Sequence, residues 1–165
     1  MPRSLKNSFF LERGPYTLVA VLDENVVSND PFMIKGDYID LFSPELEYHS
    51  EMSILPGQQA FLYDLRKIDK KRPQVIAAAS RQYDEKITEW SYSFVCKSPL
   101  NTTNIVCIYL PKEFKSGTFH VTEPLGRNVE HQLRVFEAPS NSIAGRLFWL
   151  SFENSPDGVH VQVSR

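Results

Sequence analysis

The chain has 165 residues, of which 42% are hydrophobic and 23% are charged, and its formal net charge is −2. These values are typical of a soluble globular protein, and we expect a single domain over residues 1–165. The slightly negative charge argues against non-specific electrostatic binding of nucleic acid, because such binding requires a basic face. No apolar run reaches the roughly 18 residues that a membrane-spanning helix needs.

The N-terminal apolar run, Phe9-Phe10-Leu11, is too short to form the core of a signal peptide. A cytoplasmic location is therefore the default expectation. The chain would instead be secreted if it is a processed fragment of a longer protein.

The first half of the chain consists of short apolar runs that alternate or are rich in β-branched and aromatic residues. Residues 16–22 are apolar on both faces, which predicts a central strand. Gly36-Asp37 predicts a turn between two short strands, residues 32–35 and 38–42. Further strands are predicted at the ranges 47–55, 59–65 and 75–81.

In the second half, the polar residues 84–89 predict a loop or a turn of helix, and a strand follows at residues 91–97. The continuously apolar residues 105–110 predict a buried strand. A hairpin centred on Asn101 and Thr102 would set Cys96 opposite Cys107. That geometry would permit a disulfide, and two buried thiols are the alternative.

The remaining strands are predicted at the ranges 118–121, 132–136, 147–152 and 159–163. Pro156-Asp157-Gly158 has the composition of a tight turn and predicts a hairpin between the last two strands. Trp149 is expected in the core, and His160 is expected at the surface. The whole pattern predicts an all-β fold: a two-sheet antiparallel β-sandwich, jelly-roll-like, with about ten to twelve strands.

No catalytic or cofactor motif of useful specificity is present. The chain lacks the Gly-x-Ser-x-Gly, P-loop and dinucleotide fingerprints, and its four histidines are dispersed. The sequence therefore favours a non-catalytic protein without a cofactor. The acidic turn Asp23-Glu24-Asn25 could hold a structural Ca²⁺, because hard oxygen ligands gather there.

One segment carries the residue types that bind sugars. Flat aromatic rings stack on pyranose rings, while guanidinium, amide and carboxylate groups take the hydroxyls. Arg81, Tyr83, Asp84 and Trp90 supply these groups in a predicted loop. We therefore assign them as candidate ligand-binding residues. In the alternative interpretation, Tyr83 and Trp90 cap the end of the sandwich core.

Three stretches together point to a family. They are Arg13-Gly14-Pro15-Tyr16 with Val21-Leu22-Asp23-Glu24, then Tyr92-Ser93-Phe94 with Lys97-Ser98-Pro99 and Thr102-Thr103-Asn104, and finally Phe152-Glu153-Asn154-Ser155-Pro156-Asp157-Gly158-Val159. Most of the chain thereby resembles a β-sandwich accessory domain found at the end of large, poorly characterised microbial proteins with glycoside-hydrolase-like organisation. The resemblance implies an accessory, carbohydrate-associated role and transfers no functional residue.

Three functions follow as hypotheses. The first is a non-catalytic binding or accessory module for a glycan. The second is a structural or assembly protein that pairs with a partner protein or a second copy through an edge strand or an apolar patch. The third is a small β-sandwich or barrel enzyme acting on sugars through His120 or His131. Fold alone does not choose among them, and the sequence does not fix the oligomeric state.

Overall fold

The computed structural model describes residues 7–23, 30–114, 117–136 and 143–165. Within these ranges the backbone forms thirteen strands and one short 3-10 helix, and every strand pairing is antiparallel. The predicted all-β antiparallel fold is confirmed. The described strands form three sheets, not two, and number thirteen instead of ten to twelve.

The chain divides into two compact units, Met1–Ile68 and Asp69–Arg165. Each unit has its own sheets and is described by itself. That residues 1–165 fold as a single domain stays a prediction.

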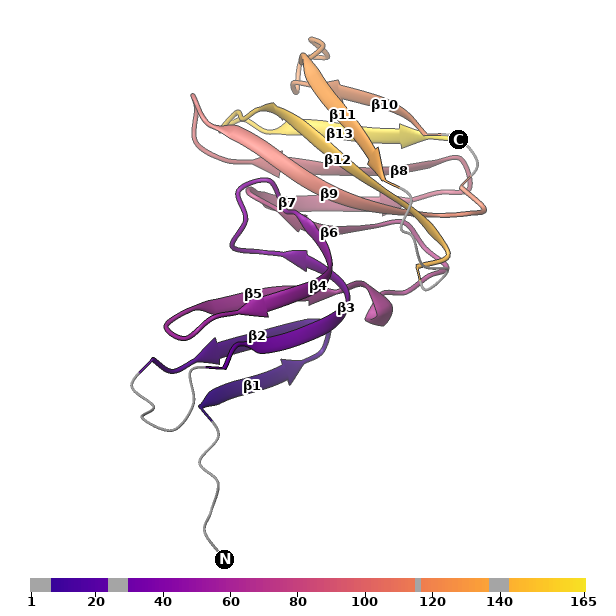
Figure 1. Ribbon diagram of the computed structural model, residues 1–165. Helices are drawn as coiled ribbons and strands as arrows, with labels where there is room; N and C mark the ends of the chain where they lie inside the picture. The colour runs from indigo at the N-terminus through magenta and orange to yellow at the C-terminus, as the bar shows by residue number, and fades with distance from the viewer. Residues whose placement is uncertain (1–6, 24–29, 115–116, 137–142) are drawn as a thin grey trace, which may run out of the picture. The chain divides into compact units, whose positions relative to one another are not determined.

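The N-terminal unit contains one five-stranded sheet, which we call sheet A (Figure 1). Its strand order is β1-β2-β5-β3-β4. The strands, followed by the 3-10 helix, are β1 (Ser8–Arg13), β2 (Tyr16–Val21), β3 (Phe32–Asp40), β4 (Tyr48–Ile54), β5 (Gln59–Asp64) and η1 (Leu65–Lys67).

A two-residue turn joins β1 to β2. Gly14 has a φ of 57° and precedes Pro15, whose ring fixes φ near −65°, and this pair of values matches a type II′ turn. Arg13 therefore pairs with Tyr16, and the register continues to Ser8 opposite Val21. One face of the resulting sheet forms the core of the unit. Its buried members are Val19, Val21, Ile34, Tyr38, Ile54, Ala60 and Leu62.

The predicted turn at Gly36-Asp37 is wrong. Residues 32–40 form one strand, β3, whose register against β4 shifts between Lys35 and Tyr38. Gly36 stands at this bulge because the Arg66 guanidinium packs against it. A Cβ at residue 36 would lie only 2.8 Å from Arg66 Cζ. Glycine here signals a close approach instead of a chain reversal.

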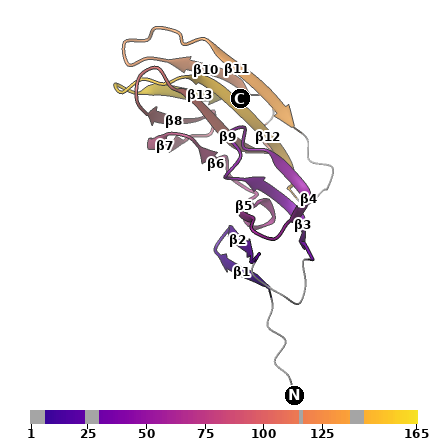
Figure 2. The same cartoon turned by 60° about the vertical axis from the view of Figure 1, so that its left-hand side comes forward.

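The C-terminal unit contains two four-stranded sheets, which Figures 1 and 2 show as two layers. Sheet B has the order β11-β12-β9-β6, and sheet C has the order β10-β13-β8-β7. The strands are β6 (Gln74–Ala78), β7 (Arg81–Ile87), β8 (Ser91–Lys97), β9 (Thr103–Pro111), β10 (Thr118–Thr122), β11 (His131–Phe136), β12 (Gly145–Glu153) and β13 (Val159–Ser164).

The core of this unit lies between sheets B and C, as in a β-sandwich. Alternate residues of β8 and β13 point inward from sheet C, and alternate residues of β9 and β12 point inward from sheet B. The buried cluster includes Phe94, Ile108, Phe148, Leu150 and Val161. Most connections between successive strands cross from one sheet to the other, which is the jelly-roll-like feature of the unit.

Two predicted hairpins are wrong for this reason. Strand β8 pairs with β13 and β7, whereas β9 pairs with β12 and β6. Cys96 consequently lies opposite Val159, and Cys107 lies opposite Trp149. The two cysteines are free and buried, as the alternative interpretation had it, and burial raises the pKa of both thiols.

The last two strands also belong to different sheets. Gly158, with a φ of 107°, closes a tight turn in which its N–H donates to the Ser155 carbonyl at 3.1 Å. The predicted turn is therefore present, but it leads from β12 in sheet B to β13 in sheet C. Trp149 is buried and His160 is exposed, and both of these predictions are confirmed.

Candidate functional site

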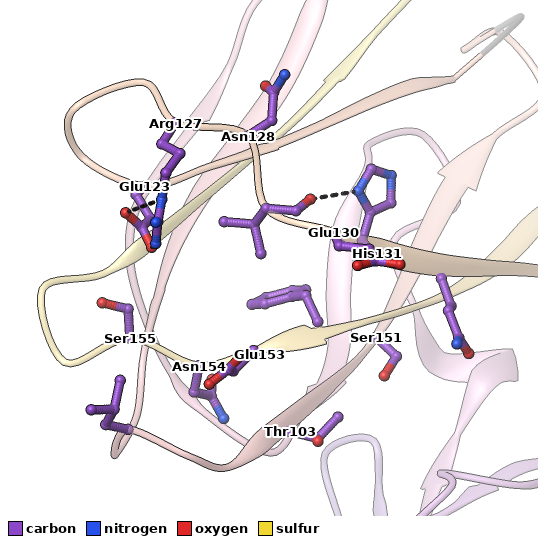
Figure 3. Close-up of a pocket in the computed structure, with 14 residues that line it drawn as sticks. Thr103, Glu123, Arg127, Asn128, Glu130, His131, Ser151, Glu153, Asn154 and Ser155 are labelled. Atoms are coloured by element: carbon purple, nitrogen blue, oxygen red, sulfur yellow. Dashed lines mark hydrogen bonds and ion pairs between the residues drawn. The ribbon is translucent and has the colours of Figure 1, made fainter.

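A pocket with a volume of about 610 Å³ opens at one end of the C-terminal unit (Figure 3). It is bounded by the chain before and within β9, the connection from β10 to β11, and the segment at the end of β12. Most of its lining residues are polar. They are Leu100, Thr103, Glu123, Arg127, Asn128, Val129, Glu130, His131, Gln132, Ser151, Phe152, Glu153, Asn154 and Ser155.

Sheet pairing brings these segments together from distant parts of the sequence. His131 at the start of β11 pairs with Phe152 of β12, and Gln132 pairs with Ser151. One residue further along β12, Glu153 pairs with Thr103 of β9. The pocket thus lies where the end of β12 meets the beginnings of its two neighbours in sheet B.

The connection from β10 to β11 folds back on itself and forms a second wall. Thr122 bridges to Asn128, and the Gly126 N–H donates to the Glu123 carbonyl at 2.9 Å. Within this turn the Arg127 Nε donates to the Glu123 carboxylate at 3.0 Å, so the two side chains form an ion pair in Figure 3. Hydrogen bonding to this carboxylate raises the pKa of the Arg127 guanidinium.

Asn154 is the most constrained polar residue of the lining. It is 3% exposed, and its backbone N–H donates to the Thr102 carbonyl at 2.8 Å. Its side-chain Nδ2 donates to Thr102 Oγ1 at 2.9 Å. Its Oδ1 atom is buried and has no hydrogen-bond donor in the described part of the chain. A buried acceptor without a donor costs about 1–3 kcal/mol.

The charges of the pocket are unbalanced. The lining carries three carboxylates, those of Glu123, Glu130 and Glu153, and one guanidinium, that of Arg127. His131 Nδ1 lies 3.1 Å from the Val129 carbonyl, and in the tautomer that donates this bond Nε2 is an acceptor. The pocket therefore offers an excess of acceptors, which suits a ligand that brings hydroxyl or ammonium donors and carries no net negative charge.

Three of the predicted ligand-binding residues lie together on β7. The predicted loop or helical turn at residues 84–89 is wrong, because the strand runs from Arg81 to Ile87. It is an edge strand of sheet C, and all of its residues are exposed. Arg81 Cζ and Lys97 Nζ each lie 5.7 Å from the centre of the Tyr83 ring. Asp84, with a φ of 52°, sits at a bulge beside Tyr83.

Trp90 is not part of that group. It is 68% exposed and lies in the turn from β7 to β8, where its backbone N–H donates to Thr88 Oγ1 at 3.2 Å. Arg81 begins the strand that ends just before this turn, so at about 3.3 Å per residue the two side chains stand roughly 20 Å apart. One small sugar cannot contact both, whereas a long glycan could. The assignment of Arg81, Tyr83, Asp84 and Trp90 as a site stays a prediction.

The histidines proposed for an enzyme line different hollows. His131 lines the pocket described above, whereas His120 lies with His160 in a smaller hollow on the outer face of sheet C. Among the described residues, no three His, Cys, Asp or Glu side chains gather as metal ligands. Of the turn predicted to hold Ca²⁺, Glu24 and Asn25 lie outside the described residues.

Sequence reasoning missed this pocket because its parts are far apart in the chain. The motif around Asn154 was interpreted as a turn, and His131 had no partner in view. The polar Asn154, two residues after the apolar strand residue Phe152, was the available signal, since buried amides need specific partners.

Comparisons with protein-family models, with curated proteins and with solved structures give no match for this chain. Over the described residues, no helix is long and apolar enough to cross a membrane.

Proposed function

We propose that the chain is a non-catalytic binding module for a glycan, and that the pocket beside Asn154 takes a neutral or amino sugar. The observation that carries this proposal is the excess of acceptors in the pocket lining, where the carboxylates of Glu123, Glu130 and Glu153 outnumber the single guanidinium of Arg127. A sugar placed in the pocket would bring hydroxyl or ammonium donors to these acceptors.

The rest of the lining supports a polyhydroxylated ligand. Carboxylates, a guanidinium, side-chain amides and hydroxyls surround the apolar Phe152 and Val129. Such mixtures of a few polar groups around an apolar floor are typical of small-molecule sites. The excess of carboxylates disfavours phosphate and sulfate ligands through like-charge repulsion. The resemblance to a carbohydrate-associated accessory domain agrees with this ligand class.

The test is a screen of the purified chain against an array of neutral, amino and acidic glycans, followed by affinity measurement for each hit. We expect a neutral or amino sugar to bind and acidic glycans to fail. Glu130→Gln and Asn154→Ala should each weaken binding about tenfold or more, equivalent to about 1.4 kcal/mol.

The controls separate the pocket from the rest of the surface. Glu113→Ala removes an exposed carboxylate that is not part of the lining and should leave affinity unchanged. Because Asn154 also holds Thr102, circular dichroism must show that its variant is folded, and Glu130→Gln tests the site on an exposed residue. Loss of binding in Tyr83→Ala with intact binding in both pocket variants would move the site to β7, and the same result in Trp90→Ala would move it to the turn after β7. A blank array would refute the glycan proposal.

A further inference from the structure

Strand β1 leaves one edge of sheet A unpaired. It ends the strand order, with β2 on one side, and no strand in the described part of the chain pairs with the other side (Figure 1). Its apolar side chains are also accessible: Phe9 is 52% exposed, Phe10 45% and Leu11 50%. Natural edge strands are usually shortened, charged or covered, because an exposed apolar edge is a template for another strand.

The hydrogen-bonding pattern shows which backbone groups this edge offers. The Leu22 N–H donates to the Asn7 carbonyl at 2.8 Å, so Asn7 and alternate residues after it bond to β2. The N–H and C=O groups of Ser8, Phe10 and Glu12 consequently point away from β2. These three residues form the available edge.

We infer that β1 pairs in antiparallel fashion with β1 of a second copy, centred on Phe10, and so joins two copies of sheet A into one continuous sheet. In this register Phe10 lies opposite Phe10 of the second copy, and Ser8 lies opposite Glu12. Each of the three outward-facing residues then exchanges both of its backbone hydrogen bonds. Moving the register by two residues leaves at least one of them without a partner.

In the same register, apolar side chains of the two copies would contact each other. Phe9 and Leu11 lie on one face of the sheet and would face each other across the new junction, at the closer spacing of a non-hydrogen-bonded pair. Beside them, Leu11, Tyr16, Leu18 and Phe61 line an apolar groove on that face of sheet A. The junction would extend this apolar surface from one copy to the next.

Charge also favours this arrangement. Glu12, which is held by Lys67 at 2.9 Å, would face Ser8 of the second copy, and Arg13 would face Asn7. No like charges meet. A parallel alignment would instead set the Glu12 carboxylates side by side, and like charges on neighbouring strands are destabilising.

The area of the contact predicts a weak dimer. Phe9, Phe10 and Leu11 are each about half exposed, so together they can bury on the order of 300 Å² per copy. A stable interface buries about 800 Å² per partner. The dimer should therefore form only at high protein concentration, and it should dissociate on dilution.

Cysteine cross-linking tests the register directly. Cys96 and Cys107 are buried, so an introduced thiol would be the accessible one. With oxidised glutathione, we expect Phe10→Cys to cross-link with itself, because the paired Cα atoms would stand about 5.5 Å apart, within disulfide range. A mixture of Phe9→Cys and Leu11→Cys should cross-link as well, whereas each of these two variants alone should not.

Light scattering over a concentration series tests the association itself. Leu11→Lys should raise the dimer dissociation constant roughly tenfold or more. Leu125→Lys, at a residue that is 98% exposed in the C-terminal unit, should leave it unchanged. A chain that remains monomeric at millimolar concentration would refute the inference. So would a dimer in which Phe42→Cys cross-links with Leu11→Cys as efficiently as Phe9→Cys does.

Discussion

The two units of this chain differ in how completely they bury their apolar side chains. The C-terminal unit encloses its large side chains between two sheets, so that Tyr92, Phe94 and Leu150 are at most 2% exposed. The N-terminal unit buries one face of a single sheet and leaves Phe9, Leu11 and other apolar side chains half exposed on the opposite face. A two-layer unit buries a core between its sheets, whereas a single sheet leaves one apolar face uncovered.

The buried polar groups of the chain differ in how fully they are hydrogen-bonded. In the N-terminal unit, the buried Asp64 carboxylate is fully engaged, because it accepts Arg66 Nε at 2.8 Å, Arg66 Nη2 at 2.8 Å and the Arg66 backbone N–H at 3.0 Å. In the C-terminal unit, the Oδ1 atom of the buried Asn154 has no donor in the described part of the chain, and Thr17 Oγ1 of the N-terminal unit is unpaired in the same sense. The pairing of Asp64 stabilises the fold, whereas each unpaired buried atom costs stability.

The largest effect should come from truncating the sandwich core. Phe94→Ala should lower the free energy of unfolding by about 3–5 kcal/mol, because it removes a ring that is 2% exposed and leaves a cavity. Urea denaturation measures the change. Phe9→Ala, at a half-exposed ring of the N-terminal unit, is the matched control and should cost less than about 1 kcal/mol at low protein concentration. Equal losses of unfolding free energy in the two variants would contradict the difference in burial between the two units.

The next effect should come from the ion pair between the buried Asp64 carboxylate and the exposed Arg66 of the N-terminal unit. Asp64→Ala removes the carboxylate that orients Arg66 toward the Tyr38 hydroxyl and should cost roughly 2–4 kcal/mol. Glu51→Ala, which breaks the exposed pair of Glu51 with Lys35, should cost less than about 0.5 kcal/mol. Chemical denaturation with a fluorescence signal can compare the two variants. A loss near zero for Asp64→Ala would show that the ion pair of Asp64 with Arg66 does not stabilise the unit.

A smaller and pH-dependent effect should come from Tyr109 in the C-terminal unit. Its hydroxyl donates to the Ile143 carbonyl at 2.9 Å, and burial raises its pKa to about 12. Above pH 10 the unfolded chain loses this proton more readily than the folded chain, so stability must fall as the pH rises from 10 to 12. The full contribution is about 2–3 kcal/mol, since one pKa unit corresponds to 1.36 kcal/mol. Tyr109→Phe should lose correspondingly less stability over this interval, as thermal melts in alkaline buffers would show.

The smallest effect on stability should come from the exposed face of sheet A. Leu11→Ser should change the free energy of unfolding of the dilute monomer by no more than about 0.5–1 kcal/mol, because half of the side chain is in water already. The same variant should abolish concentration-dependent association. A clearly larger loss in the free energy of unfolding of the dilute monomer would instead place this face of sheet A in the core of the monomer.

Much of the fold is predictable from local patterns, and the exceptions have physical reasons. The alternation in β13 and the turn at Gly158 are visible in the sequence, because each depends on neighbouring residues alone. Strand β7 was missed because an edge strand exposed on both faces has no apolar period. The false hairpins arose because strands that follow each other in the chain lie in different sheets.

The candidate site was less accessible to prediction than the fold. Residue types singled out Arg81, Tyr83, Asp84 and Trp90, but Trp90 lies in the turn after β7, away from the other three. The pocket depends instead on the pairing of β12 with β9 and β11, which joins residues near 103, 131 and 153. Such long-range register is set by the packing of the whole unit, and no local pattern in this chain encodes it.

The most direct measurement is a titration of the ¹⁵N-labelled chain with a panel of neutral, amino and acidic sugars, followed by amide chemical shifts. We expect a neutral or amino sugar to shift the amide signals of Glu123–Gln132 and Ser151–Ser155 in a saturable manner, while the signals of β1 and β7 do not shift. Shifts confined to Arg81–Trp90, or no saturable shift with any sugar, would refute the proposed site.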